Sequence, residues 1–203
     1  MTILNLEEFK KGYEKFEENE KRNAMYEVAK FLVLHFWGKP PKMTDALGVL
    51  LLTWNQAFYR YGIFDFDKLE KCITDNLPKI ETFRTRDINS FSNSDEDDIK
   101  KLFDEFLKAL QINSGKKQGT TSPVAVAKAL HLLAPNFFPL WDDKIARAYR
   151  CYYNENPVDK YISFCKKIKI MAVQLGNQIP RADKTIIKLI DEYNYSKFTK
   201  GWI

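Results

Sequence analysis

Asp142 and Asp143 stand where a short apolar crossing meets a predicted helix. Aspartate is a favoured helix N-cap, so either carboxylate could serve only to cap that helix. A carboxylate fixed at the edge of a cleft can also stabilise a developing positive charge and orient or deprotonate a water molecule. The pair therefore predicts a cap, a hydrolytic site, or both, with Asp142 as the catalytic candidate and Asp143 as a second possible catalytic group.

A polar turn with two glycines and two lysines precedes the helix that leads to this pair. The N-terminal end of a helix carries unsatisfied N–H groups and partial positive charge, so such a turn can hold a phosphate. An ordinary exposed loop is the alternative. The residues of this region that we expect to contact the phosphates of a nucleic acid are Lys116, Lys117, Gly119, Thr120, Thr121 and Ser122.

The stretch FPLWDDKIAR, from Phe138 to Arg147, resembles the segment that carries the catalytic aspartate in helix-hairpin-helix DNA glycosylases. In that family an apolar stretch with a proline leads into the aspartate, followed by an apolar and then a basic residue. The resemblance implies that Asp142 takes the catalytic position, Ile145 the apolar one and Arg147 the basic, DNA-binding one. It also implies a hairpin and catalytic segment over residues 95–153.

A weaker similarity lies upstream, where Leu50–Gln56 is similar to the apolar helix that faces the extruded base in the same family. Aromatic faces and polar groups that read base edges receive a flipped base in a pocket. The resemblance thus implies a base pocket, and the candidates for it are Trp54, Asn55, Gln56 and Trp141.

The sequence also departs from the family pattern. Only Gly115 and Gly119 mark the hairpin, and no lysine stands at its junction with the second helix; Lys128 lies further along that helix as a possible catalytic group. Bifunctional members use a lysine at the junction as a nucleophile. The resemblance therefore implies a monofunctional enzyme that uses water, and the cysteines that bind an iron–sulfur cluster in some members are absent.

Helical periodicity runs through the chain, and no segment has a convincing strand pattern. We expect an all-α fold of about 8–10 helices in one compact domain, 1–203, which could divide into two lobes. His35 and His131 fall in apolar helical patterns and are expected to be core or helix-packing residues. Residues 77–93 are expected to form mainly loop. The predicted helices span residues 5–21, 23–37, 44–62, 67–76, 94–110, 122–134, 142–153, 157–175 and 182–193.

Composition narrows the class of protein. The chain has 203 residues, and its three cysteines lack metal-ligand spacing, so we expect no metal and no cofactor. The acids at residues 95–98 suit a helix N-terminus better than a metal site. No signal peptide or membrane span is evident, which favours a cytoplasmic protein without membrane partners.

Charge is divided unevenly between the halves. Residues 1–99 hold 14 Lys/Arg against 18 Asp/Glu, and residues 100–203 hold 18 against 9. A basic C-terminal half suits a polyanion. The first hypothesis is therefore a monomeric DNA glycosylase that acts on a damaged or modified base flipped out of duplex DNA, in repair or in defence against phage. The alternatives are a non-catalytic helix-hairpin-helix DNA-binding module and a helical protein-interaction domain.

Overall fold

Helices supply all the regular secondary structure in the described chain. The computed structural model describes residues 5–20, 23–176, 178–179 and 184–203, with no strand among them. The all-α prediction is confirmed. The ten α-helices are α1 (Leu6–Asn19), α2 (Ala24–His35), α3 (Pro40–Trp54), α4 (Gln56–Tyr59), α5 (Phe66–Arg84), α6 (Glu96–Ala109), α7 (Pro123–Leu133), α8 (Asp143–Ala148), α9 (Pro157–Leu175) and α10 (Ile186–Asn194).

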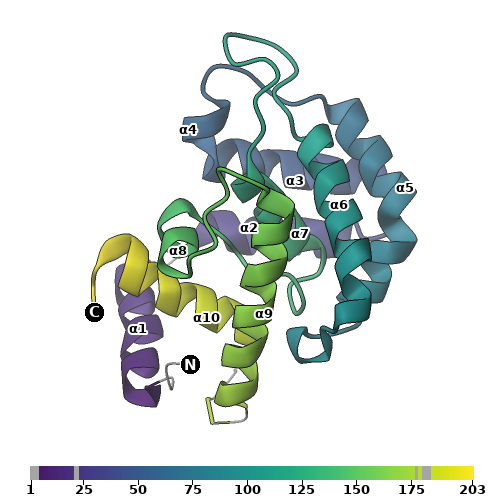
Figure 1. Ribbon diagram of the computed structural model, residues 1–203. Coiled ribbons are helices and arrows are strands. Elements are labelled where there is room, and N and C mark those ends of the chain that lie inside the picture. Colours follow the sequence, from purple (N-terminus) through teal and green to yellow (C-terminus); the bar gives the residue numbers. More distant parts are fainter. Residues whose placement is uncertain (1–4, 21–22, 177, 180–183) are drawn as a thin grey trace.

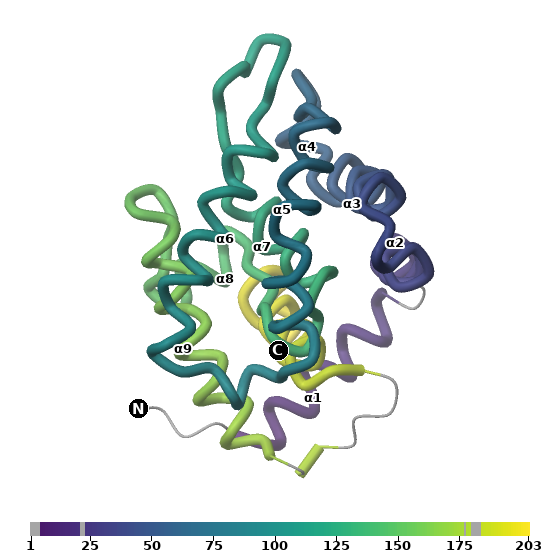
Figure 2. Tube along the Cα trace, turned by 90° about the vertical axis from the view of Figure 1, so that its right-hand side faces the viewer, coloured from purple at the N-terminus to yellow at the C-terminus, as the bar shows by residue number. Residues whose placement is uncertain are grey.

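The apolar helix α7 lies near the centre of the molecule. Figure 2 shows α6 and α9 on one side and α2 and α3 on the other, and α7 contacts α2, α3 and α6. A third group lies below them in Figure 1, where α1 runs beside α10 and the π-helical segment η3 (Tyr195–Lys200) turns back toward α8. Segments distant in sequence thus meet around the short helix α8.

One hydrophobic cluster connects these groups. It includes Phe9 of α1, Leu47 of α3, Phe106 of α6, Leu130 of α7 and Phe164 of α9, all fully buried. Burial of a large apolar side chain contributes about 1.5–3 kcal/mol relative to exposure, so this shared core fixes the helices around α7. None of the helices in the described ranges is both long and apolar enough to span a bilayer.

The prediction of loop at residues 77–93 is wrong for its first part, because α5 continues through Pro78 to Arg84. Proline removes one helical N–H and disfavours a helix interior. Here Ile80 and Phe83 beyond the proline are buried and extend the apolar stripe of the helix. Tertiary burial therefore outweighs the local effect of proline.

The predicted start of the third helix is also wrong. Thr44 does not cap α3, which begins at Pro40 and carries Thr44 as a buried residue inside it. Proline fits the first turn of a helix, where its missing N–H has no helical partner to lose. The Pro40-Pro41 pair thus starts α3 rather than only ending α2. The predicted end of this helix at residue 62 is wrong too, because the chain turns at Asn55 and divides the segment into α3 and α4.

Most other predicted helix ends lie within about a turn of the observed ones. Asn5 caps α1, Ser122 caps α7 and Asp142 caps α8, each through its side chain. Helix α8 ends at Ala148 instead of continuing to residue 153, because Arg150 has a left-handed backbone, φ 55°. The predicted end of the first helix near residue 21 and the predicted start of the last near residue 182 lie outside the described residues.

The two histidines have different environments. His131 is fully buried; its Nδ1–H donates to the Phe138 carbonyl (2.8 Å) and its Nε2 accepts from the Tyr26 hydroxyl (3.0 Å). The prediction of a core histidine is confirmed there. It is wrong for His35, which is exposed and stacks on Phe31 at the outer surface of α2.

Candidate functional site

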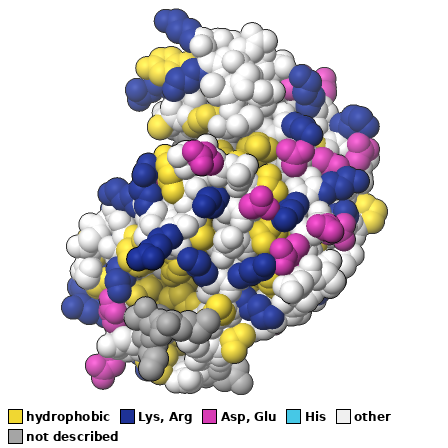
Figure 3. Space-filling model, viewed as in Figure 1, with side chains coloured by type: hydrophobic (Ala, Val, Ile, Leu, Met, Phe, Trp, Pro, Cys, Tyr) yellow, Lys and Arg dark blue, Asp and Glu magenta, His cyan; other side chains and the backbone are white. Residues whose placement is uncertain are grey.

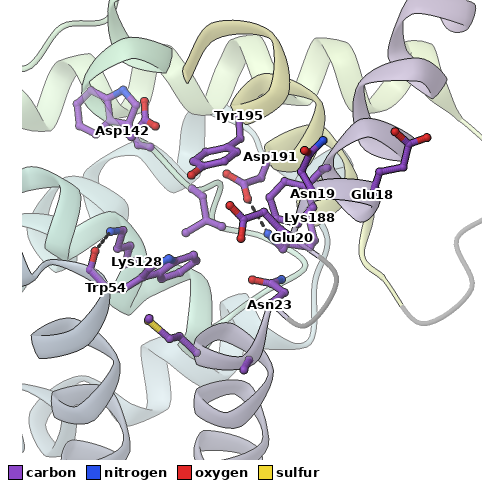
Figure 4. Close-up of a pocket in the computed structure, with 15 residues that line it drawn as sticks. Glu18, Asn19, Glu20, Asn23, Trp54, Lys128, Asp142, Lys188, Asp191 and Tyr195 are labelled. Atoms are coloured by element: carbon purple, nitrogen blue, oxygen red, sulfur yellow. Dashed lines mark hydrogen bonds and ion pairs between the residues drawn. The ribbon is translucent and has the colours of Figure 1, made fainter. Parts of the chain in front are cut away.

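A cavity of about 710 Å³ lies where α1, α2, α3, α7, α8 and α10 meet. Ligand sites commonly have volumes of about 300–1,000 Å³. Figure 4 shows Asp142, Lys128 and Trp54 on one side of this cavity, with Asp191, Lys188 and Glu20 across from them. The cavity is thus lined by Asp142 and Lys128, which were catalytic candidates from the sequence, and by charged residues that the sequence analysis did not identify.

Asp142 is held at the head of α8 by both of its carboxylate oxygens. The Ile145 N–H donates to Oδ1 (2.7 Å), and the Thr199 hydroxyl of η3 donates to Oδ2 (2.7 Å). The residue is half-buried on the cavity wall. A cap from its own helix and a hydroxyl from a distant segment therefore fix this carboxylate in place.

Burial raises the pKa of Asp142 above its ordinary value, an effect that the hydrogen bonds from Ile145 and Thr199 oppose. The charge of Asp191 adds to the increase, and that of Lys128 works against it. The carboxylate is thus a stronger base than a free aspartate.

Asp143 has a different environment from its neighbour. It is exposed and forms an ion pair with Arg147 one turn along α8, with an Nε to Oδ2 distance of 3.0 Å. The Arg147 guanidinium also lies over the Tyr152 ring, 3.5 Å from its centroid. Neither Asp143 nor Arg147 lines the cavity.

Lys128 extends from α7 to the C-terminal end of α3. Its Nζ donates to the Trp54 carbonyl (2.9 Å) and to Asn55 Oδ1 (2.7 Å), and it lies 4.8 Å from the centroid of the Trp54 ring. Asn55 Nδ2 in turn donates to the hydroxyl of Ser122, the α7 cap (3.3 Å). Asn55 therefore positions Lys128 rather than lining the cavity itself.

The ammonium of Lys128 is largely removed from water. Burial lowers the pKa of Lys128 to about 8, against the opposing charges of Asp142 and Asp191. A lysine in this state remains mostly protonated at neutral pH and loses its proton at a much lower pH than an ordinary lysine.

The predicted base-pocket residues separate into two groups. Trp54 and Trp141 line the cavity, although Trp141 is only 1% exposed and packs among the rings of Phe103, Tyr153, Tyr161 and Phe164. Asn55 and Gln56 do not line it; Gln56 begins α4 as an exposed residue. The chain turns at Asn55, and this turn directs Gln56 away from the cavity.

A buried ion cluster on α10, which sequence reasoning missed, forms the wall opposite Asp142. Lys188 is 2% exposed and Glu192 fully buried; Lys188 Nζ lies 2.8 Å from Asp191 Oδ2 and 3.8 Å from Glu192 Oε1. Lys184 also bonds to Glu192 (2.8 Å). The sequence does contain a signal for this cluster, because a Lys, an Asp and a Glu interrupt the apolar run of residues 186–194.

The glycine-containing turn lies in the α6–α7 loop, residues 110–122. Its backbone is ordered: the Gly119 N–H donates to the Ile112 carbonyl (2.9 Å), and the Thr120 carbonyl accepts from the Ile112 N–H (3.0 Å). Lys116, Lys117 and Thr121 are exposed. Figures 1 and 2 show this loop at the end of the molecule away from α1, and none of its residues lines the cavity. The predicted phosphate-binding turn and the predicted catalytic aspartate therefore lie in different parts of the molecule.

Charge is distributed unevenly over the surface. Lys and Arg side chains are frequent on the face of Figure 3, where α8, α9 and η3 lie, while Asp and Glu gather mainly toward α5 and α6. The cavity itself is lined by four carboxylates, of Glu18, Glu20, Asp142 and Asp191, against two ammonium groups. Among the described residues, no three His, Cys, Asp or Glu side chains lie together in a way that could hold a metal ion.

No protein-family model matches the chain, and neither a curated protein nor a solved structure matches it.

Proposed function

We propose that the protein is a monofunctional DNA glycosylase of the helix-hairpin-helix type, in which Asp142 promotes hydrolysis of the bond between a damaged or modified base and its sugar. The observation that carries the proposal is the position of Asp142: a carboxylate fixed by Ile145 and Thr199 on the wall of a 710 Å³ cavity with tryptophan rings beside it. The protein would act in the cytoplasm as a monomer, on duplex DNA, in repair or in defence against phage.

Cleavage of an N-glycosidic bond builds positive charge on the sugar. The ionised Asp142 stabilises this charge, and because its two hydrogen bonds leave a lone pair free on each oxygen, it can also accept a proton from water. The water oxygen bonds to C1′ as the C1′–N bond breaks and its electron pair leaves with the base. The water proton passes to Asp142 and then to solvent, and the leaving base takes a proton from solvent.

Trp54 and Trp141 are the residues proposed to contact the extruded base, because aromatic faces accept stacked bases. Lys116, Lys117 and the basic surface around α8 and α9 are proposed to hold phosphates. Since Arg147 is already paired with Asp143 and stacked on Tyr152, we expect a DNA phosphate to compete with Asp143 for its guanidinium.

The decisive experiment compares two neighbouring aspartates. Duplexes carrying a panel of modified bases are incubated with the protein and then treated with alkali, which cleaves abasic sites. Asp142→Asn is expected to lower the single-turnover rate about 100-fold or more, whereas the exposed Asp143→Asn changes it less than about threefold. If Asp142→Asn excises the base at the parent rate, the proposed role of Asp142 is wrong. If the parent protein binds DNA but excises no base, the non-catalytic DNA-binding module is favoured.

Asp142→Asn is well suited to this test because asparagine also caps helices. Its Oδ1 can accept from the Ile145 N–H, and its Nδ2 can donate to the Thr199 oxygen. The raised pKa of Asp142 means that ionisation destabilises the folded state as pH rises through the shifted range. The neutral variant is thus expected to unfold at the same temperature as the parent or higher.

A second candidate function is a protein-interaction domain, favoured by one surface. Four large apolar side chains of α2 are more than half exposed: Met25, Val28, Phe31 and Leu34. Exposed apolar patches mark interaction sites when they are contiguous. Absence of DNA binding at low salt, together with a partner lost on Phe31→Glu, would select this function.

A further inference from the structure

One N–H group of the Lys128 ammonium has no hydrogen-bond acceptor among the described residues of the cavity wall. A protonated lysine carries three N–H groups. Two of them go to the Trp54 carbonyl and Asn55 Oδ1, which lie side by side at the end of α3. Across the described ranges no other hydrogen bond to Nζ is present, and Lys128 lines the cavity, so its third N–H is available to a ligand.

Trp141 provides a second unused donor on the same wall. Its indole N–H is buried and has no hydrogen-bond partner in the described part of the protein. Buried polar groups are nearly always paired in folded proteins, so this unpaired N–H marks the wall as incompletely satisfied. Because the indole N–H is enclosed by protein atoms, Lys128 is the donor that the cavity offers to an acceptor group of a ligand.

The charge of the cavity restricts that acceptor to an uncharged group. Four lining residues carry carboxylates and two carry ammonium groups, one of which, Lys188, is already paired with Asp191. Carboxylates at this density disfavour a phosphate or another anion. A carbonyl oxygen on a neutral ring satisfies the Lys128 donor without adding negative charge.

We infer that Lys128 selects the substrate base, by donating its third N–H to an oxo group of the extruded ring, so that the substrate class is a base with an oxo group in place of an exocyclic amine, as in uracil and hypoxanthine. The inference rests on the proposed function and specifies its substrate.

An exocyclic amine fits the same position poorly. It would direct its own N–H groups at the ammonium of Lys128, so two donors would meet and both would lose their solvation. Sites built around a specific hydrogen bond reject analogues that lack it by large factors. Asn55 strengthens the selection because it fixes the direction of Nζ.

The selection depends on the protonation of Lys128. The neutral amine has two N–H groups, which the two protein acceptors occupy, and its lone pair then faces the cavity. The charged groups that act on Lys128 are Asp142 of α8 and Asp191 of α10, and Lys188 of α10 also lines the cavity. Carboxyl groups ordinarily titrate several units below pH 8. A loss of rate near pH 8 therefore reports on a lysine.

The test measures single-turnover excision on duplexes that differ in one base, uracil against cytosine and hypoxanthine against adenine. We expect the parent protein to prefer the oxo base about 100-fold or more. Lys128→Met reduces that preference at least about tenfold, and Lys128→Arg, which keeps a charged donor, retains most of it. The parent rate on oxo bases falls as pH rises through about 8, and the rate of Lys128→Arg does not.

Several results would overturn the inference. Equal rates on oxo and amine bases, or an unchanged preference in a folded Lys128→Met, would show that Lys128 does not select the base while leaving the proposed excision intact. A covalent complex trapped by borohydride at pH 9, and absent in Lys128→Met, would show that the amine attacks the sugar instead. Excision of no base in the panel would remove the proposed function itself. If Lys128→Met fails to fold, the pH profile of the parent protein decides.

Discussion

The cavity wall and the α6–α7 loop both carry charged residues that the sequence marked as functional, yet the two regions are built differently. On the wall, Asp142 accepts hydrogen bonds from Ile145 of its own helix and from the distant Thr199, and Lys128 donates two to the end of α3. In the loop, Lys116 and Lys117 are exposed, and within the described ranges neither forms an ion pair. The backbone is ordered in both regions, so the difference lies in the side chains.

This difference separates two kinds of function. Catalysis by charge needs a group held in a fixed place, and the wall supplies one. Phosphate binding by counterion release needs accessible cations, and the loop supplies those without fixing them. The comparison predicts that substitutions on the wall change stability and chemistry, whereas substitutions in the loop change only affinity and its salt dependence.

The largest expected effect concerns the buried ion cluster of the wall. Lys188→Met leaves the carboxylates of Asp191 and Glu192 without their shared ammonium, which should lower the free energy of unfolding by about 3–5 kcal/mol. The exposed Lys116→Met should change it by less than about 0.5 kcal/mol. Urea unfolding at pH 7 measures both. Similar midpoints for the two variants would show that the wall is no more tightly constrained than the loop.

The second effect depends on pH. Burial lowers the pKa of His131 to about 4, whereas an unfolded histidine titrates near 6.5. The unfolded state therefore binds the proton first, and stability is lost as pH falls from about 6.5 toward 4, by up to about 3 kcal/mol. Unfolding at pH 7 and pH 5 should show a smaller pH dependence in His131→Phe than in the parent. The exposed His35→Gln should match the parent, and a pH dependence that persists in His131→Phe would assign it to carboxylates.

The third effect concerns affinity for DNA. The double variant Lys116→Ala, Lys117→Ala should weaken binding and reduce the slope of log K against log salt by about one unit for each lysine that contacts a phosphate. Fluorescence anisotropy at several salt concentrations measures this slope. Lys71→Ala, on exposed α5 and paired with Asp75, is the matched control. An unchanged slope in the double variant would exclude the loop from the DNA interface.

The smallest expected effect is a shift of the acid limb of the pH–rate profile. Thr199→Val removes a hydrogen bond that lowers the pKa of Asp142, so that pKa rises further and activity is lost at a higher pH than in the parent. Thr120→Val in the loop also removes a hydroxyl bond, to the Lys117 carbonyl, and should leave the limb in place. Superimposable profiles for all three proteins would show that another group sets the acid limb.

Local signals made much of the fold predictable. Cap residues followed by apolar stripes located α1 and α7, the apolar stripe located α6, and a first-turn proline located α9, because these signals operate within one or two turns. The same local reasoning failed at Pro78, where burial of Ile80 and Phe83 carries the helix onward. It also failed at His35, because a periodic pattern does not reveal that no neighbouring helix covers that face.

The site was predictable only in part, for a related reason. Asp142 and Lys128 were identifiable from residue type and position. Their spacing in the sequence does not predict that both line one cavity, which only the structure shows. Asp191 and Thr199 could not be connected to Asp142 in advance, because they lie 49 and 57 residues further along the chain and approach it only through the packing of α10 and η3. Tertiary contacts of this range leave no local pattern.

The distance in sequence between Asp142 and Thr199 has a consequence for synthesis of the protein. A ribosome adds residues in order, so a nascent chain that has emerged only through α9 contains Asp142 and Lys128 but neither Asp191 nor Thr199. In such a fragment the Oδ2 atom of Asp142 has no hydroxyl donor, and the wall opposite it is missing. The cavity is therefore assembled late, when α10 and η3 dock, and unfinished chains lack the complete site.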